Sequence, residues 1–318
     1  MKVITFNDIK KLNISPVKCY EWVEEMLMHK NDAILPAKIS LHLENDAFFN
    51  VMPCLLPQFD AGGVKVITRH LGRVPSLDSQ IVLYDYETGT PKAIMDGNWI
   101  TTMRTGAVAA HTIKTLAVKD FYEIGVMGLG NTGRAAMKVL LAMYPERPLK
   151  IKVLKYKDQH ELYTRYFKGE DGKNYPNAEF VYVDSYEDVV RGSDVIISAV
   201  TYTDDDFCSA DCFKEGVLVD AVHLRGFLGC DLAFDKVFCD DDAHVRGFKY
   251  YDKWKYHAEV AEVITGRAKG RESDSERIIA YNVGLSMHDM NFANRVYEMC
   301  GNAGTEISLD PPTDKFWV

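Results

Sequence analysis

Residues 123–140, EIGVMGLGNTGRAAMKVL, constrain the fold more than any other stretch, because Gly128, Gly130 and Gly133 follow an apolar run and open a helical pattern. In such a strand–turn–helix unit the first glycine permits a tight turn and the second lets a pyrophosphate approach the backbone. The third lets the helix pack close to the sheet. Unpaired amides at the helix N-terminus then favour phosphate. The alternative is an ordinary glycine-rich turn, but the surrounding pattern favours a dinucleotide site.

That surrounding pattern is an alternation of short apolar runs and helical segments from residue 123 onward. The runs are EIGVMG, LKIKVLKY, AEFVYVD, SDVIISAV, GVLVDAV and DKVFCDD. Near-continuous apolar runs are typical of buried parallel strands, and their alternation with helices is typical of a doubly wound sheet. We therefore predict an α/β fold with a Rossmann-type doubly wound parallel sheet. Residues 273–300 are predicted to form a long helical tail that begins at Ser273 and Glu276.

The first 120 residues follow a different pattern. AKISLHL, GGVKVITRHL and QIVLYDY-ETGT-PKAIMDG indicate strands, and WITTMRTGAVAAHTIKTLAV indicates a helix that starts after two threonines. We expect a smaller α+β domain at residues 1–118, the Rossmann domain at 119–290, and a C-terminal helix and tail at 291–318.

Composition restricts the class of protein. A net charge of −9 over 318 residues argues against a nucleic-acid or membrane-surface binder. No run approaches the length of a membrane span, and the start MKVITFNDIKKL lacks the apolar stretch that a signal peptide is expected to carry. Seven cysteines without a CxxC pair predict reduced thiols in the cytoplasm. The acidic clusters at 203–207 and 239–244 lack spaced histidine partners, so we predict solvated carboxylates and no metal.

The end of the strand after the glycine turn bears on cofactor choice. Lys155, Tyr156 and Lys157 stand about 20 residues after the turn, where an NAD-binding chain would place an Asp or Glu for the ribose. Two ammonium groups suit a 2′-phosphate, and the Tyr156 ring can cover the adenine. The alternative is a solvated strand end. The absent carboxylate favours NADP(H) over NAD(H).

The stretch GGVKVITRHLG…QIVLYDYETGTPKAIMDGNWITTMRTGAVAA resembles the ornithine cyclodeaminase/mu-crystallin family. The resemblance continues through GLGNTG and VIISAVT into EVAEVITGRAKGRESDSERIIAYNVGLSMHDM, and so covers most of the chain. It implies that the leading residues form a substrate-binding and dimerising domain, to which the C-terminal helix returns. The partners it implies are an amino, imino or keto acid and a second copy of the chain.

The resemblance also implies site residues. Lys65 and Arg104 match the family's lysine and arginine that bind the substrate carboxylate, and charge-assisted contacts suit that task. The alternatives are a lysine that reaches solvent and an arginine on a helix surface. Lys38 takes the place of a family arginine, and Met52 either lines the substrate pocket or packs in the core. Besides the glycine turn and residues 155–157, we expect the cofactor to contact Thr105, Asn131, Thr132, Val200, Thr201 and Gly284.

One position bears on the reaction. Cyclodeaminating members carry an aspartate in a segment like INAVGxDxPGxxEL, and the matching stretch here is VDAVHLRGFLGCDL. Arg225 stands in the aspartate's place and His223 replaces a glycine. Arg225 stays protonated and cannot be a general base, but it can bind a second carboxylate. The alternative is an exposed loop arginine. His223 is either a proton shuttle or a structural histidine bonded to the backbone.

We therefore predict an NADP(H)-dependent oxidoreductase that transfers hydride between the nicotinamide and the alpha carbon of an amino or imino acid, with Lys65, His223 and Arg225 as catalytic candidates. One alternative is an ornithine cyclodeaminase, which converts ornithine to proline and ammonia with recycled NAD. Another is a crystallin-like protein that binds NADPH without catalysis.

Overall fold

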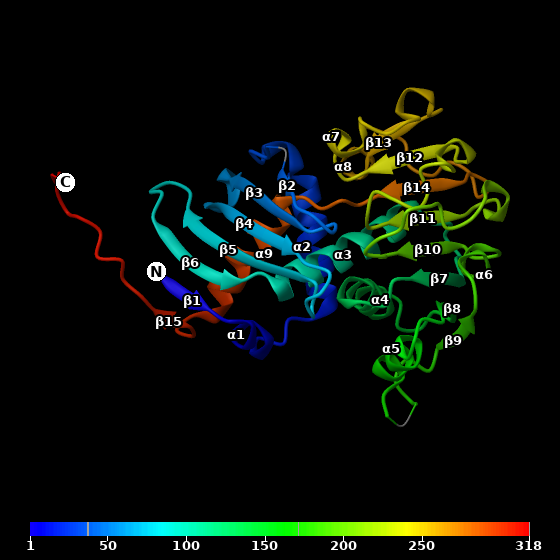
Figure 1. The fold of residues 1–318 in the computed structure, drawn as a ribbon, viewed down its shortest axis with the longest axis horizontal. Coiled ribbons are helices and arrows are strands. Elements are labelled where there is room, and N and C mark those ends of the chain that lie inside the picture. The colour runs from blue at the N-terminus through cyan, green and yellow to red at the C-terminus, as the bar shows by residue number, and fades with distance from the viewer. Residues whose placement is uncertain (37, 171, 318) are drawn as a thin grey trace. The chain divides into compact units, whose positions relative to one another are not determined.

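The computed structural model describes residues 1–36, 38–170 and 172–317, and its chain divides into two compact units (Figure 1). Unit 1 comprises Met1–Ile14, His29–Thr101 and Ser286–Val318, and unit 2 comprises Ser15–Met28 and Thr102–Leu285. The helix α3, Asn98–Leu116, carries the chain from unit 1 into unit 2. Its residues Thr101 and Thr102 lie inside the helix, so the predicted start after these threonines is wrong.

Unit 2 is built on a parallel sheet. Among the described residues it has eight strands in the order β13-β12-β14-β11-β10-β7-β8-β9. Neighbouring strands of this sheet pair in parallel throughout the described part of the unit. The bounds are β7 Glu123–Met127, β8 Leu149–Leu154, β9 Ala178–Val183, β10 Val195–Ser198, β11 Leu218–Ala221, β12 Lys236–Cys239, β13 His257–Glu259 and β14 Ile278–Tyr281.

This order confirms the predicted Rossmann-type fold. β8 and β9 lie on one side of β7, and the chain then crosses back to β10, which lies on the other side of β7. The six apolar runs predicted as strands all form strands of this sheet. The helices of unit 2, besides most of α3, are α2 Pro16–Met28, α4 Asn131–Met143, α5 Gln159–Lys168, α6 Tyr186–Val190, α7 Asp242–Val245 and α8 Val260–Ile264.

Close packing against the sheet and between helices depends on two glycines of unit 2. A Cβ on Gly106 of α3 would lie 2.4 Å from the Ala135 backbone of α4, so the two helices touch backbone to backbone at this point. A Cβ on Gly125 of β7 would lie 2.5 Å from the Val189 carbonyl of α6. Both positions therefore require glycine for packing.

The predicted helical tail from Ser273 is wrong in its first part. Glu276 accepts the amide of Glu272 at 2.8 Å, which forms a turn, and Ile278–Tyr281 is the fully buried strand β14. β-branched and aromatic residues pack well between parallel neighbours, and here β11 and β12 flank the strand. The helix α9 starts only at Ser286 and runs to Cys300.

Unit 1 is a mainly antiparallel sheet. Among the described residues it has seven strands in the order β15-β1-β6-β5-β4-β3-β2. Their bounds are β1 Lys2–Ile4, β2 Ile39–His42, β3 Phe48–Leu56, β4 Ala61–Arg69, β5 Leu77–Asp85, β6 Pro91–Asp96 and β15 Thr305–Glu306, and the helix α1 spans Phe6–Lys11.

The two faces of this sheet differ in what covers them. Helix α9 packs on β3, β4 and β5, and on this face of β3 the side chains of Asn50, Met52, Cys54 and Leu56 are buried. The other face carries a group of exposed apolar side chains, which lie together because residues of β2 pair directly with residues of β3. Ile39 and Leu41 of β2 are 57% and 55% exposed, and Phe49 and Leu55 of β3 are each 39% exposed.

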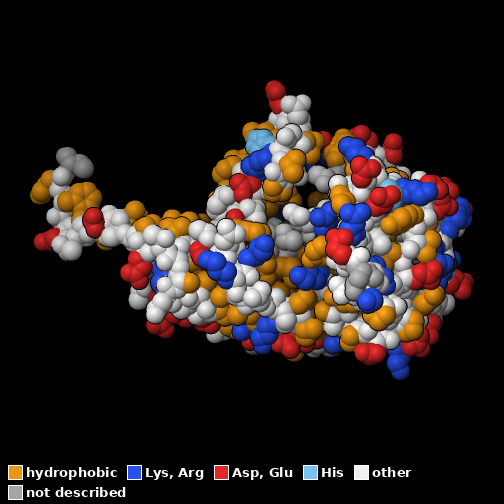
Figure 2. Space-filling model, turned by 90° about the horizontal axis from the view of Figure 1, so that it is seen from below, with side chains coloured by type: hydrophobic (Ala, Val, Ile, Leu, Met, Phe, Trp, Pro, Cys, Tyr) orange, Lys and Arg blue, Asp and Glu red, His pale blue; other side chains and the backbone are white. Residues whose placement is uncertain are grey.

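The cysteines and charged side chains bear on the expectations from composition. Acidic and basic side chains are interspersed on the face of the molecule drawn in Figure 2. In the described part of the chain no helix is long and apolar enough to cross a membrane. The seven cysteines, all within that part, are buried and form no disulfide.

Candidate functional site

The glycine turn lies at the carboxyl end of β7, in unit 2. Gly128 has φ +85°, a conformation that favours glycine, and a Cβ on Gly133 would lie 2.1 Å from the Gly128 carbonyl oxygen. Gly130 is the N-cap residue of α4, and a Cβ there would meet nothing within 4 Å. The protein itself therefore needs glycine at 128 and 133, whereas the space beside Gly130 is open to a pyrophosphate at the helix N-terminus.

The other predicted cofactor residues of unit 2 lie around this turn and at other strand ends. Asn131 and Thr132 form the first turn of α4, and Val200 and Thr201 follow β10. Thr105 lies in α3, next to Gly106 where α3 touches α4. Carboxyl ends of parallel strands meet at one edge of a doubly wound sheet, which is where nucleotides bind. The residues present thus fit a dinucleotide.

Lys155, Tyr156 and Lys157 follow β8, and all three are exposed. Such exposure is what the alternative, a solvated strand end, also predicts. Lys155 Nζ lies 2.8 Å from Oδ1 of Asp184, the residue after β9. Lys157 has φ +47°, and its Nζ lies 5.2 Å from the centre of the Tyr156 ring. Sequence reasoning missed Asp184, because this acid stands on the neighbouring strand and only the sheet brings it to the lysine.

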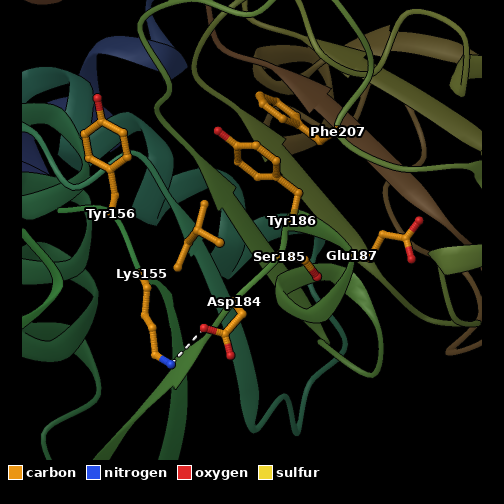
Figure 3. A pocket seen from close by; sticks show the side chains of 8 residues that line it. Lys155, Tyr156, Asp184, Ser185, Tyr186, Glu187 and Phe207 are labelled. Carbon is orange, nitrogen blue, oxygen red and sulfur yellow. Dashed lines mark hydrogen bonds and ion pairs between the residues drawn. The ribbon is translucent and has the colours of Figure 1, made fainter.

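A pocket of about 430 Å³ opens beside these residues. Figure 3 shows the Lys155–Asp184 pair at one end and the rings of Tyr156 and Tyr186 at the other. The Tyr186 ring packs on Phe207, with 4.6 Å between the ring centres. The pocket is lined by Leu154, Lys155, Tyr156, Asp184, Ser185, Tyr186, Glu187 and Phe207. It is large enough for part of a nucleotide.

His223 lies just after β11 and is held on two sides. Its Nε2 is 2.6 Å from Ser198 Oγ, at the end of β10, and its ring stacks on Phe227 at 8° with 6.2 Å between centres. Burial lowers the pKa of His223 to about 4, and a hydrogen bond with the Arg225 backbone acts in the opposite direction. The ring is therefore neutral at pH 7. The ring thus contacts the Ser198 hydroxyl as well as the Arg225 backbone, and whether it shuttles a proton stays a prediction.

Arg225 lies on the exposed loop after β11, and its guanidinium carbon is 4.9 Å from the centre of the Tyr202 ring, on the loop after β10. Cation–π contact of this kind favours a fixed guanidinium. Tyr202 donates a hydrogen bond to Asp204, which is also on that loop. Sequence reasoning did not single out Tyr202, since an aromatic residue in a loop has no motif that marks it.

Arg104 is 5% exposed, so it is not the helix-surface arginine of the alternative reading. A Cβ on Gly284, which has φ +104°, would lie 2.8 Å from Arg104 Nη1. The Gly284 backbone therefore passes directly over the guanidinium. The Gly284 amide donates to Asp240 Oδ2 at 2.5 Å, which fixes this segment at the carboxyl end of β12.

Lys65 belongs to unit 1, in the middle of β4. Its side chain is 0% exposed, so the alternative of a lysine that reaches solvent is wrong. Its Nζ lies 2.5 Å from Oδ2 of Asp289 on α9, which is also 0% exposed. Cys54 of β3 is nearby: burial, with a smaller effect from the Asp289 carboxylate, raises the pKa of its thiol to about 12. Sequence reasoning missed Asp289, although a carboxylate within a buried helix stripe is a signal for a buried ion pair.

Two further predicted substrate residues, Met52 and Lys38, also belong to unit 1. Met52 pairs directly with Lys65 and is 5% exposed, so its side chain is on the α9 face of the sheet. Lys38 precedes Ile39, which pairs with Val51. Unit 1 therefore brings Met52 and Lys65 to directly paired positions of β3 and β4, and Lys38 stands just before β2, which is the next strand to β3.

The acidic clusters are not simply solvated, which corrects the prediction. Asp240 is 4% exposed, and besides the Gly284 amide it contacts His244 Nδ1 at 3.0 Å. Asp206 accepts the amide of Gly229 at 2.7 Å. Within the described residues, no group of three or more His, Cys, Asp or Glu side chains is arranged to hold a metal ion.

The sequence profile of the ornithine cyclodeaminase/mu-crystallin family matches residues 2–303. The chain belongs to this family. The predicted resemblance is thus confirmed, and the family signature extends over both units.

Two curated members of the family align with nearly the whole chain. The nodulation efficiency protein NfeD of Rhizobium meliloti is 28% identical over 310 residues, which cover 93% of this chain and 94% of that protein. A Δ1-pyrroline-2-carboxylate reductase of Bacillus cereus is 26% identical over 330 residues, covering 96% and 98%. Among solved structures, the Δ1-pyrroline-2-carboxylate reductase of Thermococcus litoralis in complex with NADH and L-proline has a TM-score of 0.86 at 26% identity, covering 96% of this chain and 100% of that one.

Proposed function

We propose that this protein is an NAD(P)-dependent oxidoreductase that transfers hydride between the nicotinamide and the alpha carbon of an imino or amino acid. The observation that carries the proposal is the glycine turn at 128–133, whose Gly130 leaves open space at the N-terminus of α4. The similarity to Δ1-pyrroline-2-carboxylate reductases, one of them bound to NADH and L-proline, supports imino acids as the substrate class.

Arg225 favours net oxidation or reduction over cyclodeamination. A cyclodeaminase would need a carboxylate here to move protons, and a guanidinium stays charged at any working pH. The contact with Tyr202 holds that positive charge on the loop after β11. We propose that Arg225 disfavours cationic substrates such as ornithine and favours substrates with a second carboxylate.

A bound nicotinamide supplies or accepts the hydride, and the chain's residues bind and orient the substrate. We propose that Arg104 and Lys65 each bind the substrate carboxylate, since both are cations almost wholly removed from water. The Asp289 carboxylate lies 2.5 Å from the Lys65 ammonium and offsets its positive charge in these dry surroundings. His223, neutral at pH 7, contributes by orienting the Ser198 hydroxyl rather than as a positive charge.

We also propose that the protein uses NADP(H) in preference to NAD(H), on the strength of Lys155 and Lys157 at the end of β8. No carboxylate stands at that strand end, and two ammonium groups suit a 2′-phosphate. The ion pair between Lys155 and Asp184 works against this preference, because it already occupies one of the two ammonium groups.

We further propose that a second copy of the chain covers the apolar face of the sheet in unit 1. Ile39, Leu41, Phe49 and Leu55 are exposed together on β2 and β3, and apolar patches of this kind mark interfaces. Sedimentation equilibrium tests this: Leu41→Lys shifts a dimer toward monomer, whereas Leu162→Lys, at a residue 46% exposed on α5, leaves the mass unchanged. A monomeric parent protein would contradict it.

The experiment that tests the function is a substrate screen with both reduced and both oxidised nicotinamides. Net oxidation of NAD(P)H with imino acids, or with keto acids and an amine, supports the proposal. Proline and ammonia from ornithine without net change in the cofactor indicate a cyclodeaminase, and tight NADPH binding without turnover indicates a binding protein.

A further inference from the structure

The Lys155–Asp184 pair stands where a Rossmann-type sheet reads the ribose of its nucleotide. Lys155 follows β8, Asp184 follows β9, and the Lys155 amide bonds to the Val183 carbonyl at 2.9 Å, so the two strand ends are joined. β8 lies next to β7, which carries the glycine turn. The pair therefore belongs to the carboxyl edge of the sheet, beside the pocket of about 430 Å³ (Figure 3).

The Lys155–Asp184 ion pair is largely exposed to solvent and contributes little to the stability of the fold. The side chains of Lys155 and Asp184 are 45% and 77% exposed. Exposed ion pairs add little to folding stability, because water competes for both charges. A ligand that offers either group a better partner can therefore rearrange the pair at low cost, and substitution of Asp184 leaves the fold intact.

The two side chains favour different ligands. A carboxylate accepts hydrogen bonds from a ribose diol, which is how an acid at this sheet edge selects NAD(H). An ammonium favours a 2′-phosphate, which is also a stronger partner for Lys155 than a carboxylate because it carries nearly two negative charges. Asp184 would then repel the phosphate while Lys155 attracts it.

We infer that Asp184 is the residue that limits NADP(H) preference in this protein and keeps NAD(H) usable, by binding the ribose hydroxyls and by opposing a 2′-phosphate. The missing acid at the end of β8 is thus supplied from β9. This inference rests on the proposed nucleotide-binding function. It predicts that a single neutral substitution at Asp184 moves the preference strongly toward the phosphorylated cofactor.

The test measures dissociation constants of NADH and NADPH by fluorescence titration for the parent protein, Asp184→Asn and Lys155→Gln. Asp184→Asn should tighten NADPH binding by about tenfold, the effect of removing one charge roughly 6 Å from a doubly charged phosphate in water. NADH binding should weaken several-fold. Lys155→Gln should shift the ratio of the two constants in the opposite direction.

Glu187→Gln is the matched control. Glu187 lines the same pocket, but its carboxylate points away from Lys155 and lies 3.8 Å from Arg191. This variant should leave the ratio of the two dissociation constants within twofold. An unchanged ratio in Asp184→Asn, an equal change in Glu187→Gln, or no binding of either cofactor would overturn the inference.

Binding and turnover separate this inference from the proposed function. A shifted ratio in a protein that reduces no imino or keto acid leaves the inference standing and removes the oxidoreductase proposal. Turnover with an unshifted ratio removes the inference alone. Matching unfolding temperatures of the variants and the parent show that the fold is unchanged.

Discussion

Replacing Asp289 with Asn should unbalance the buried ion pair of unit 1. Lys65 Nζ and Asp289 Oδ2 lie 2.5 Å apart and both side chains are 0% exposed. At that distance and an effective dielectric constant of about 20, the attraction is roughly 7 kcal/mol, which mainly offsets the cost of removing both charges from water. In Asp289→Asn the Lys65 ammonium stays buried but loses the negative charge of the Asp289 carboxylate. We therefore expect the free energy of unfolding to fall by about 3–5 kcal/mol.

Urea unfolding followed by circular dichroism measures this loss. The control is Glu21→Gln, which removes a charge from the pair Lys18–Glu21, 2.9 Å apart and 54% and 52% exposed, and should cost less than about 1 kcal/mol. The double variant Lys65→Met/Asp289→Leu should lose less stability than the two single changes added together. A loss below about 1 kcal/mol for Asp289→Asn, or strict additivity, would refute the account of a dry, coupled pair.

Further predictions concern unit 2. Arg104→Met should raise the substrate KM, with a loss of about 2–4 kcal/mol in substrate binding, while the cofactor dissociation constants stay within a few-fold of the parent's. A collapse of NADPH binding would instead assign Arg104 to the cofactor site or to the fold. Gly284→Ala should raise the same KM, because its Cβ would come within 2.8 Å of the Arg104 guanidinium; an unchanged KM would contradict that contact. The pKa of His223 is about 4 in the folded protein and about 6.5 in the unfolded chain, so the neutral ring contributes its full stability above pH 6.5. The free energy of unfolding should fall by up to about 3 kcal/mol from this residue as the pH drops to 4. His223→Gln should flatten that loss in urea unfolding at pH 7 and pH 5, and an equal loss in parent and variant would show the ring to be solvated.

The Rossmann-type sheet could be predicted because its strands are apolar runs and its glycines mark one turn. β14 could not, since Ile278–Tyr281 is a short run between a capping pattern at Ser273 and Glu276 and the real helix α9. Periodicity alone does not separate a buried strand from a buried helical segment of this length. The position of β14 between β11 and β12 decides its conformation.

The site residues divide in the same way. Gly130 stands in a glycine motif, and the resemblance to the family points to Lys65. Their partners depend on contacts between distant segments: Asp289 reaches Lys65 from a helix 224 residues later, and Asp184 reaches Lys155 from the next strand. Burial, which lowers the pKa of His223, is likewise a property of the packed loops around Phe227. No single-sequence pattern carries that information.

The central claim is hydride transfer between the nicotinamide and the alpha carbon of an imino acid. The direct measurement uses NADPH with deuterium at the transferring position, Δ1-pyrroline-2-carboxylate as substrate, and mass spectrometry with proton NMR of the product. Our account predicts one deuterium at the alpha carbon of proline, in equal amount to the NADPH oxidised. Proline without deuterium, or no proline from this or any other imino acid while NADPH binds tightly, would contradict it.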